Sequence, residues 1–181
     1  MKSEIENQCS MNYHNITSPD MLNGSGLRTV LWVSGCTNKC PGCHNPQTHS
    51  FTSGIPFDEK ALNELIDKLR PDYIQGLTLS GGDPMHERNV PQVLDIVRLV
   101  RREFEFSKDI WIYTGYRLDE LLARRDDDTT ELIRSINVLV DGKFELDKKD
   151  PLLHFRGSSN QRILKITDGL NGEFYTSELN L

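Results

Sequence analysis

Three of the four cysteines in this 181-residue chain, Cys36, Cys40 and Cys43, lie within eight residues of one another. Their spacing, C-x3-C-x2-C, gathers thiolates of the kind that bind zinc or an iron–sulfur cluster. In a reducing compartment, clustered cysteines are more often metal ligands or catalytic groups than halves of disulfides. The fourth cysteine, Cys9, lies far upstream, so the short segment supplies one ligand fewer than a closed four-ligand site requires.

Two kinds of metal site are compatible with these three thiolates. A structural zinc site is closed by four ligands, and His49 could complete a set of three cysteines and one histidine. His44 is a poorer fourth ligand because it directly follows Cys43 in the chain. A 4Fe-4S cluster held by only three cysteines would instead leave one iron open to a small-molecule ligand. The spacing alone does not decide between the two.

A glycine-rich turn, LSGGDP from Leu79 to Pro84, follows the next predicted strand. Gly81 and Gly82 carry no side chain, so a ligand could approach the backbone closely there, and Asp83 adds an acceptor for an ammonium group. Alone, such a turn is typical of any tight strand-to-helix connection. A structural zinc loop does not need one, however, so its place one unit after the cysteines favours a cluster beside a small-molecule site.

The chain between and after these motifs alternates between strand and helix patterns. Short apolar runs rich in β-formers predict strands at 29–34, 75–80, 110–113 and 136–140. Helical periodicity predicts one helix from an N-cap at Asp58 to just before Pro71, and others at 90–102, 118–125 and 129–135. From Lys143 onward the chain is predicted to be rich in loops, with one apolar stretch at 163–166.

Strands that alternate with helices imply an α/β fold with a parallel sheet. Each predicted strand ends in a polar or glycine-bearing turn (SGC, SGGDP, TGY or VDG), and ligand sites in such folds gather at the carboxyl ends of the strands. There are too few units for a closed eight-fold barrel. We therefore expect a partial (β/α) barrel or a curved, mostly parallel sheet in a single domain at 11–166, with a loose extension at 1–10 and a tail at 167–181.

The composition argues against two classes of partner. The formal net charge is -6, so the chain has no basic footprint for nucleic acid. No apolar run approaches the roughly 20 residues that a membrane span needs. The first fifteen residues, MKSEIENQCSMNYHN, lack the apolar core of a signal peptide. We expect a cytoplasmic protein that binds neither nucleic acid nor membrane.

Five separated motifs, in order, resemble the activating proteins of anaerobic (class III) ribonucleoside-triphosphate reductases, a family of the radical S-adenosylmethionine (SAM) superfamily. They are MNYHNITSPDMLNGSGLRTVLWVSGCTNKCPGCHNP, LSGGDPMHERNVPQVL, DIWIYTGYRLDEL, INVLVDGKFELDKKDP and FRGSSNQ, and they run from about Met11 to Arg162. Two positions differ: His44 stands where the family usually has tyrosine, and NGSG (Asn23 to Gly26) stands where the family has NGPG.

The resemblance implies a cofactor site and a reaction. It assigns Cys36, Cys40 and Cys43 to one 4Fe-4S cluster, and it places Gly42, Cys43, His44, Gly81, Gly82 and Asp83 against SAM. An external electron donor such as flavodoxin would reduce the cluster, and SAM would split into methionine and a 5′-deoxyadenosyl radical. That radical would take a hydrogen atom from a glycine of the large reductase subunit. No catalytic residue beyond the cluster is expected.

Two other functions are weighed beside this one. The first is a zinc-stabilised binding module that uses Cys36, Cys40, Cys43 and His49. The second is a radical SAM enzyme that acts on a small molecule, which the short chain disfavours because little of it is left to cover a substrate. Thr114 and Asp141 end strands at the expected rim and are candidate contacts to SAM. We expect Trp32, Trp111 and Tyr113 to lie in the core, and RGSSNQ to form a surface loop or a contact with the partner.

Overall fold

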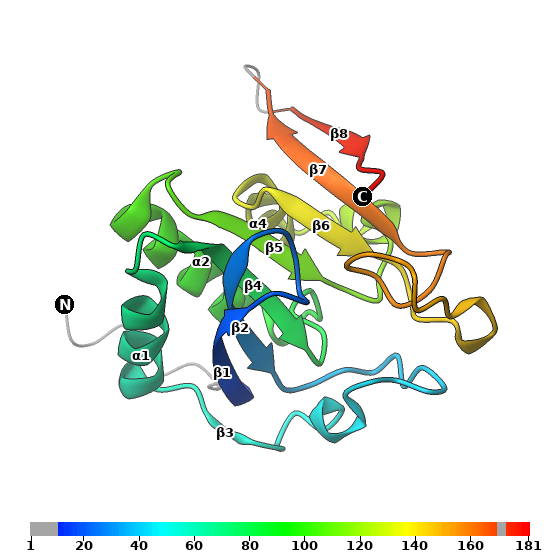
Figure 1. Cartoon of the computed structure of the whole chain (residues 1–181), viewed down its shortest axis with the longest axis horizontal. Coiled ribbons are helices and arrows are strands. Elements are labelled where there is room, and N and C mark those ends of the chain that lie inside the picture. Colours follow the sequence, from blue (N-terminus) through cyan, green and yellow to red (C-terminus); the bar gives the residue numbers. More distant parts are fainter. Residues whose placement is uncertain (1–10, 170–172) are drawn as a thin grey trace.

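The computed structural model describes residues 11–169 and 173–181, which form one mixed α/β layer structure (Figure 1). Eight strands of these residues make a single sheet in the order β3-β1-β2-β4-β5-β6-β7-β8. The strands are β1 (Asn12–Asp20), β2 (Leu27–Val33), β3 (Ile55–Pro56), β4 (Ile74–Gly81), β5 (Asp109–Tyr113), β6 (Val138–Asp141), β7 (Arg162–Asp168) and β8 (Phe174–Glu178). The helices are α1 (Glu59–Leu69), α2 (Val90–Phe104), α3 (Leu118–Ala123) and α4 (Asp127–Arg134), with short 3-10 turns at Pro46–Thr48 and Leu146–Lys148.

The centre of the sheet is parallel and its edges are antiparallel. Strands β2, β4, β5 and β6 pair in parallel, and they are the four strands predicted from the sequence. Antiparallel strands flank them on both sides, so the sheet is mixed, whereas the sequence predicted a mostly parallel one. On one side, β1 leads into β2 through residues 21–26, and strands joined by so short a connection pair antiparallel. On the other side, β7 follows the long connection from β6 and runs antiparallel to it.

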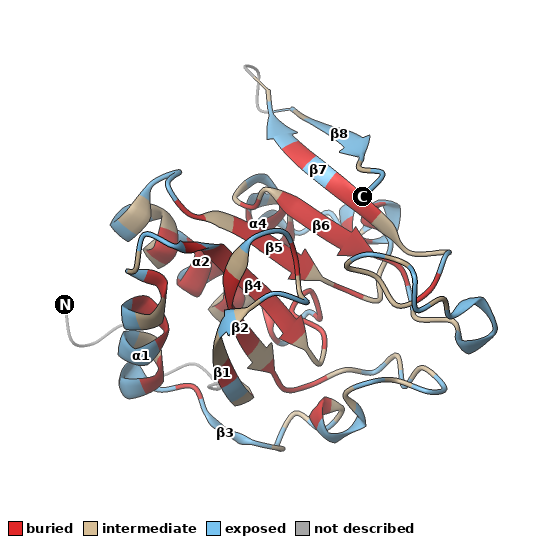
Figure 2. Cartoon of the chain, in the orientation of Figure 1, coloured by how far each residue is buried: buried red, intermediate tan, exposed pale blue. Residues whose placement is uncertain are grey.

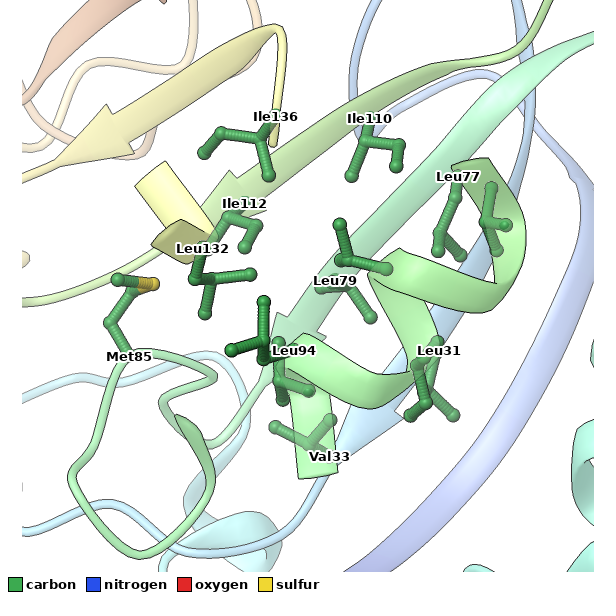
Figure 3. Close-up of a cluster of buried hydrophobic side chains, with 14 of the residues drawn as sticks. Leu31, Val33, Leu77, Leu79, Met85, Leu94, Ile110, Ile112, Leu132 and Ile136 are labelled. Atoms are coloured by element: carbon green, nitrogen blue, oxygen red, sulfur yellow. The ribbon is translucent and has the colours of Figure 1, made fainter. Parts of the chain in front are cut away.

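Period-2 alternation along the central strands separates two faces of the sheet. One face carries Leu79 and Ile112, which pack with side chains of all four helices in the main hydrophobic cluster. Figure 3 shows part of this cluster, including Leu94 of α2 and Leu132 of α4. Figure 2 shows that β4, β5 and β6 are largely buried, whereas β8 at the edge is mostly exposed.

The predicted boundaries of α1 are confirmed in detail. The Asp58 side chain accepts a hydrogen bond from the backbone N–H of Ala61, which is the N-cap contact expected for this residue type. The helix ends at Leu69, ahead of Pro71, which lacks the N–H needed to continue it. None of the helices in the described ranges is long and apolar enough to cross a membrane.

The face of the sheet opposite the helices carries a second, smaller cluster around Trp111, Val138 and Val140. Arg28 is fully buried beside this cluster, with its guanidinium 5.3 Å from the centre of the Trp111 ring. The guanidinium donates hydrogen bonds to Thr78 Oγ1 (2.6 Å), Leu77 O (2.8 Å) and Ser25 O (3.0 Å), and it pairs with Asp109 at 2.6 Å. Arg28 therefore attaches the turn between β1 and β2 to the sheet.

Replacing Arg28 by methionine should destabilise the fold by about 3 kcal/mol or more, because removing one partner of a buried ion pair leaves the others uncompensated. Arg98→Met is the matched control, since Arg98 forms an exposed ion pair with Glu131 that should contribute less than about 1 kcal/mol. Urea denaturation of the two variants measures the difference. Equal losses in both would show that the buried network does not stabilise the fold.

Candidate metal and cofactor site

A cavity of about 440 Å³ opens at the carboxyl ends of the parallel strands. Segments that follow these strands contribute most of its wall: the cysteine loop (residues 34–46) after β2, the GGDP turn (residues 81–84) after β4, Thr114 and Gly115 after β5, and residues 143–161 after β6. Gly142, after β6, also lines it. The structure thus brings the four predicted turns to one site, as expected for strands that run in the same direction.

The cysteine loop is held in a closed shape by backbone hydrogen bonds. The N–H groups of Gly35 and Cys36 donate to the carbonyls of Thr48 (2.8 Å) and His49 (3.0 Å), and Cys43 N–H donates to Cys40 O (3.1 Å). Gly35 has a φ of +97°, and a Cβ there would lie 2.1 Å from the Phe51 ring, so only glycine fits. These contacts bring the segment after the loop (Thr48 and His49) back beside the start of the loop (Gly35 and Cys36), and the three cysteines between them line the cavity.

All three thiols, of Cys36, Cys40 and Cys43, are free, partly buried and part of the cavity wall. Burial raises the pKa of the Cys36 and Cys40 thiols, while backbone N–H groups lower it by hydrogen bonding. The donor to Cys40 is the N–H of Phe144, from the outer loop (residues 143–161) between β6 and β7. These donors would offset the negative charge of bound thiolates, so the set suits a soft metal centre.

A single zinc ion and a 4Fe-4S cluster would place different geometric demands on these three thiols. Among the residues that the structure describes, no three His, Cys, Asp or Glu side chains are gathered to hold one metal ion. A single zinc ion would draw its sulfur ligands to within about 4 Å of one another, since Zn–S bonds are about 2.3 Å long. A 4Fe-4S cluster accepts a wider spread because each cysteine binds a different iron atom.

Asp83 is buried at the end of β4, and its carboxylate joins three segments of the cavity wall. The carboxylate accepts hydrogen bonds from Thr114 Oγ1 (2.8 Å), Gly115 N–H (3.0 Å), Met85 N–H (3.0 Å) and Asn38 Nδ2 (3.1 Å). Burial raises the pKa of Asp83 to about 6, and the hydrogen bonds oppose that rise. Four donors match the roughly four lone-pair sites of a carboxylate, so these bonds leave little capacity for a ligand ammonium group.

Gly81 and Gly82 line the cavity, but the space beside them is filled by backbone. A Cβ on Gly82 would lie 2.7 Å from the carbonyl oxygen of Gly35, and one on Gly81 would lie 2.7 Å from that of Val33. The Gly82 N–H donates to the Val33 carbonyl at 2.7 Å, and the Asp83 N–H donates to the Gly35 carbonyl at 2.8 Å. The glycines are therefore required for close contact between the GGDP turn and the start of the cysteine loop.

Asn89 reinforces this contact, a role that no sequence motif indicated. Its Nδ2 donates to the carbonyls of Asp83 (2.9 Å), Ser34 (3.0 Å) and Gly35 (3.3 Å). Asn89 occupies the N-cap position of α2 without capping it, because its side chain turns to the two loops instead. An asparagine just before a helix normally caps it by accepting a hydrogen bond from a backbone N–H of the first turn. In this structure the Asn89 side chain donates to the loop carbonyls instead.

The outer loop packs against the cysteine loop. The rings of His44 and Phe144 lie 5.4 Å apart, and a Cβ on Gly42, where φ is +73°, would lie 2.8 Å from Leu146. His44 also lines the cavity. Close by in sequence, His49 lines the same cavity, and its buried Nε2 has no hydrogen-bond partner among the described residues.

The remaining candidates divide into supporting and cavity-lining residues. Thr114 lines the cavity but its hydroxyl is donated to Asp83, whereas Asp141 pairs with Arg162 and accepts the Leu118 N–H at the start of α3.

The three strand aromatic residues were expected in the core, but only one of them lies there. Trp111 lies in the core as expected. Trp32 and Tyr113 line the cavity, together with Leu22, Asn23, Leu153, Phe155 and Arg156. Strand alternation could place these residues on one face but could not show that a cavity opens there.

Comparison with known proteins identifies relatives of this chain. The family described as 4Fe-4S single cluster domain matches residues 22–164. The anaerobic ribonucleoside-triphosphate reductase-activating protein of Escherichia coli (strain K12) is 49% identical over 153 residues, 83% of this chain and 96% of the relative. Proteins of the same name are 47% identical over 159 residues in Pasteurella multocida (strain Pm70), covering 87% and 99%, and 39% identical over 160 residues in Enterobacteria phage T4, covering 88% and 97%.

The raised pKa of Asp83 predicts a specific pH dependence of stability in the cluster-free protein. Since the folded value of about 6 exceeds the ordinary value of 3.8, ionisation favours the unfolded chain, and this penalty grows as the pH rises from 4 through 6. Relative to Asp83→Asn, which cannot ionise, the wild type should lose about 1 kcal/mol between pH 5 and pH 7. Urea denaturation at both pH values tests this, and a pH-independent difference would contradict it.

Proposed function

We propose that this chain, which belongs to the family of anaerobic ribonucleoside-triphosphate reductase-activating proteins, activates such a reductase by radical SAM chemistry. The observation that carries the proposal is the shared cavity of the three thiols and the GGDP turn. One loop supplies three thiolates, and the GGDP turn beside it contributes backbone and small side chains to the same wall. Such a cavity can hold a cluster with an open iron and a small molecule beside it.

The residues that would hold the cluster are Cys36, Cys40 and Cys43. Backbone N–H groups directed at Cys36 and Cys40 would offset its negative charge. When bound, the cluster would supply the electron, taken from an external donor such as flavodoxin, for cleavage of SAM into methionine and a 5′-deoxyadenosyl radical. That radical takes a hydrogen atom from a glycine of the large reductase subunit, where a glycyl radical is left. The reaction requires no general acid or base from this chain.

The cavity volume of about 440 Å³ lies within the range of ligand pockets, roughly 300–1,000 Å³. We assign Gly42, Cys43, His44, Gly81, Gly82 and Asp83 to its SAM-binding wall. The role of Asp83 and the glycines in this assignment is to hold the wall in place. Arg156 also lines the cavity, and its buried Nε has no hydrogen-bond partner among the described residues, so it is available to pair with the carboxylate of SAM.

Two observations weigh against the other functions. A zinc-stabilised module is disfavoured because the family that matches residues 22–164 is one of 4Fe-4S single cluster domains. An enzyme that acts on a small molecule would need to enclose its substrate, yet Leu22, which lines the cavity, is 80% exposed. An open cavity suits a protein substrate. A cytoplasmic location and a flavodoxin-like donor belong to the same proposal.

Cys40→Ala should abolish binding of the cluster, because two thiolates hold it too weakly. Cys9→Ala is the matched control and should keep the iron and sulfide content of the wild type; Cys9 lies outside the described residues. Iron and sulfide analysis with visible absorption after anaerobic reconstitution measures both. A colourless wild-type protein with one zinc ion per chain would support the zinc module instead.

The reaction itself is tested with purified anaerobic ribonucleoside-triphosphate reductase, reductant and SAM under anaerobic conditions. A persistent organic radical should appear on the reductase by electron paramagnetic resonance. Deuterium on the α-carbon of the reductase's glycines should appear in the 5′-deoxyadenosine formed, because the hydrogen moves directly between the two carbons. Conversion of a small metabolite without any radical on the reductase would overturn the proposed function.

A further inference from the structure

The cavity continues beyond the residues assigned to the cluster and SAM. We propose that its far end, around Trp32, Tyr113 and Phe155, binds the glycine-bearing peptide segment of the reductase, with the Tyr113 hydroxyl hydrogen-bonded to the peptide backbone. This inference rests on the proposed function and names the part of the site that holds the protein substrate.

Tyr113 provides the first observation. Its side chain lines the cavity, and its buried hydroxyl has no hydrogen-bond partner among the described residues. Burial raises its pKa, so the hydroxyl stays neutral and keeps its proton. The neighbouring Trp32 differs, because its Nε1 donates to Thr17 Oγ1 at 3.0 Å. Buried polar groups nearly always have partners, so a hydroxyl left open beside a cavity indicates a ligand.

The walls of this end are the second observation. One wall is the hairpin tip (residues 21–26), which in Figure 1 is the blue turn that crosses the sheet between β1 and β2. Asp20 Oδ1 accepts from the N–H groups of Leu22 (2.9 Å) and Asn23 (3.0 Å), and Thr78 Oγ1 donates to Asn23 O (2.7 Å). The hairpin tip is therefore fixed to the sheet and presents Leu22 at the cavity.

A second part of the wall comes from the outer loop. Leu153 and Phe155 line the cavity, and the Phe155 ring meets the Trp111 ring edge-on, with centroids 5.7 Å apart. Because Trp111 also lies beneath Arg28, the same cluster supports both walls. The hairpin tip and this part of the outer loop are thus both anchored, and the aromatic residues Trp32 and Tyr113 line the same cavity.

Charge and exposure indicate which ligand this end takes. The side chains that line this end carry no formal charge, so they provide no ion pair for the amino or carboxylate groups of SAM; they are Leu22, Trp32, Tyr113, Leu153 and Phe155. A neutral peptide backbone needs only a hydrogen-bond partner and apolar contact. Beside the cavity, Met21, Leu22 and Leu152 are 69%, 80% and 84% exposed, and exposed apolar side chains on both walls suit contact with a protein. Glycine suits such a site because its backbone can approach closely.

Tyr113→Phe tests the hydroxyl, with Tyr175→Phe on the exposed strand β8 as its matched control. The Tyr113 variant should fold as stably as the wild type, since the hydroxyl has no partner to lose. Its iron content and SAM affinity should match the wild type. Its KM for the anaerobic reductase should rise at least five-fold, and fewer glycyl radicals should form per 5′-deoxyadenosine released. A lower SAM affinity with an unchanged KM for the reductase would overturn the inference.

Leu22→Asp tests the hairpin tip independently of Tyr113. It should weaken the complex with the reductase at least ten-fold, because it places a charge where an apolar contact is made. Tyr175→Asp, which is also exposed but lies on β8 at the edge of the sheet away from β1 and β2, should bind as the wild type does. A wild-type protein that leaves no radical on the reductase overturns both proposals. Normal activation by both Tyr113→Phe and Leu22→Asp overturns this inference alone.

Discussion

The arrangement of the cavity depends on one buried carboxylate, that of Asp83. It accepts hydrogen bonds from the cysteine loop, from its own turn and from the turn after β5. A buried charge without partners would be strongly unfavourable, so folding requires these donors to converge on it. The same requirement fixes three segments, drawn from widely separated parts of the chain, in a single relative position.

Close packing of the backbone also holds the GGDP turn against the cysteine loop. The GGDP turn approaches the start of the cysteine loop so closely that a Cβ fits at neither Gly81 nor Gly82, and Asn89 joins the carbonyls on both sides. A site built in this way positions its ligand-binding groups before any ligand arrives, which is the condition for precise cofactor chemistry. The sequence suggested that Gly81 and Gly82 leave room for a ligand. In the structure that room is occupied by the backbone of Val33 and Gly35.

The sequence predicts the local features of this fold but not the contacts between distant segments. The four parallel strands and the capped start of α1 follow from local periodicity and capping chemistry, which neighbouring residues determine. Strand β1 was missed because NYHNITSPD is largely polar, and its pairing with β2 is decided by the hairpin and not by its own composition. The thiols were identified from spacing alone. The role of Asp83 as a junction depends on Thr114 and Gly115, whose approach only the tertiary fold determines.

The two faces of the sheet explain why rigidity and recognition can coexist in so short a chain. Alternation along β2, β4 and β5 sends leucine and isoleucine to the helix-covered face, where the main cluster stabilises the sheet. The intervening residues, among them Trp32, Trp111 and Tyr113, form the other face, and in place of a helix they carry the hairpin tip and the outer loop. Arg28 anchors that tip from beneath while pairing with Asp109 at the start of β5. The wall that we assign to the protein substrate is therefore held by the same buried cation that stabilises the fold, so its position cannot change without a cost to stability.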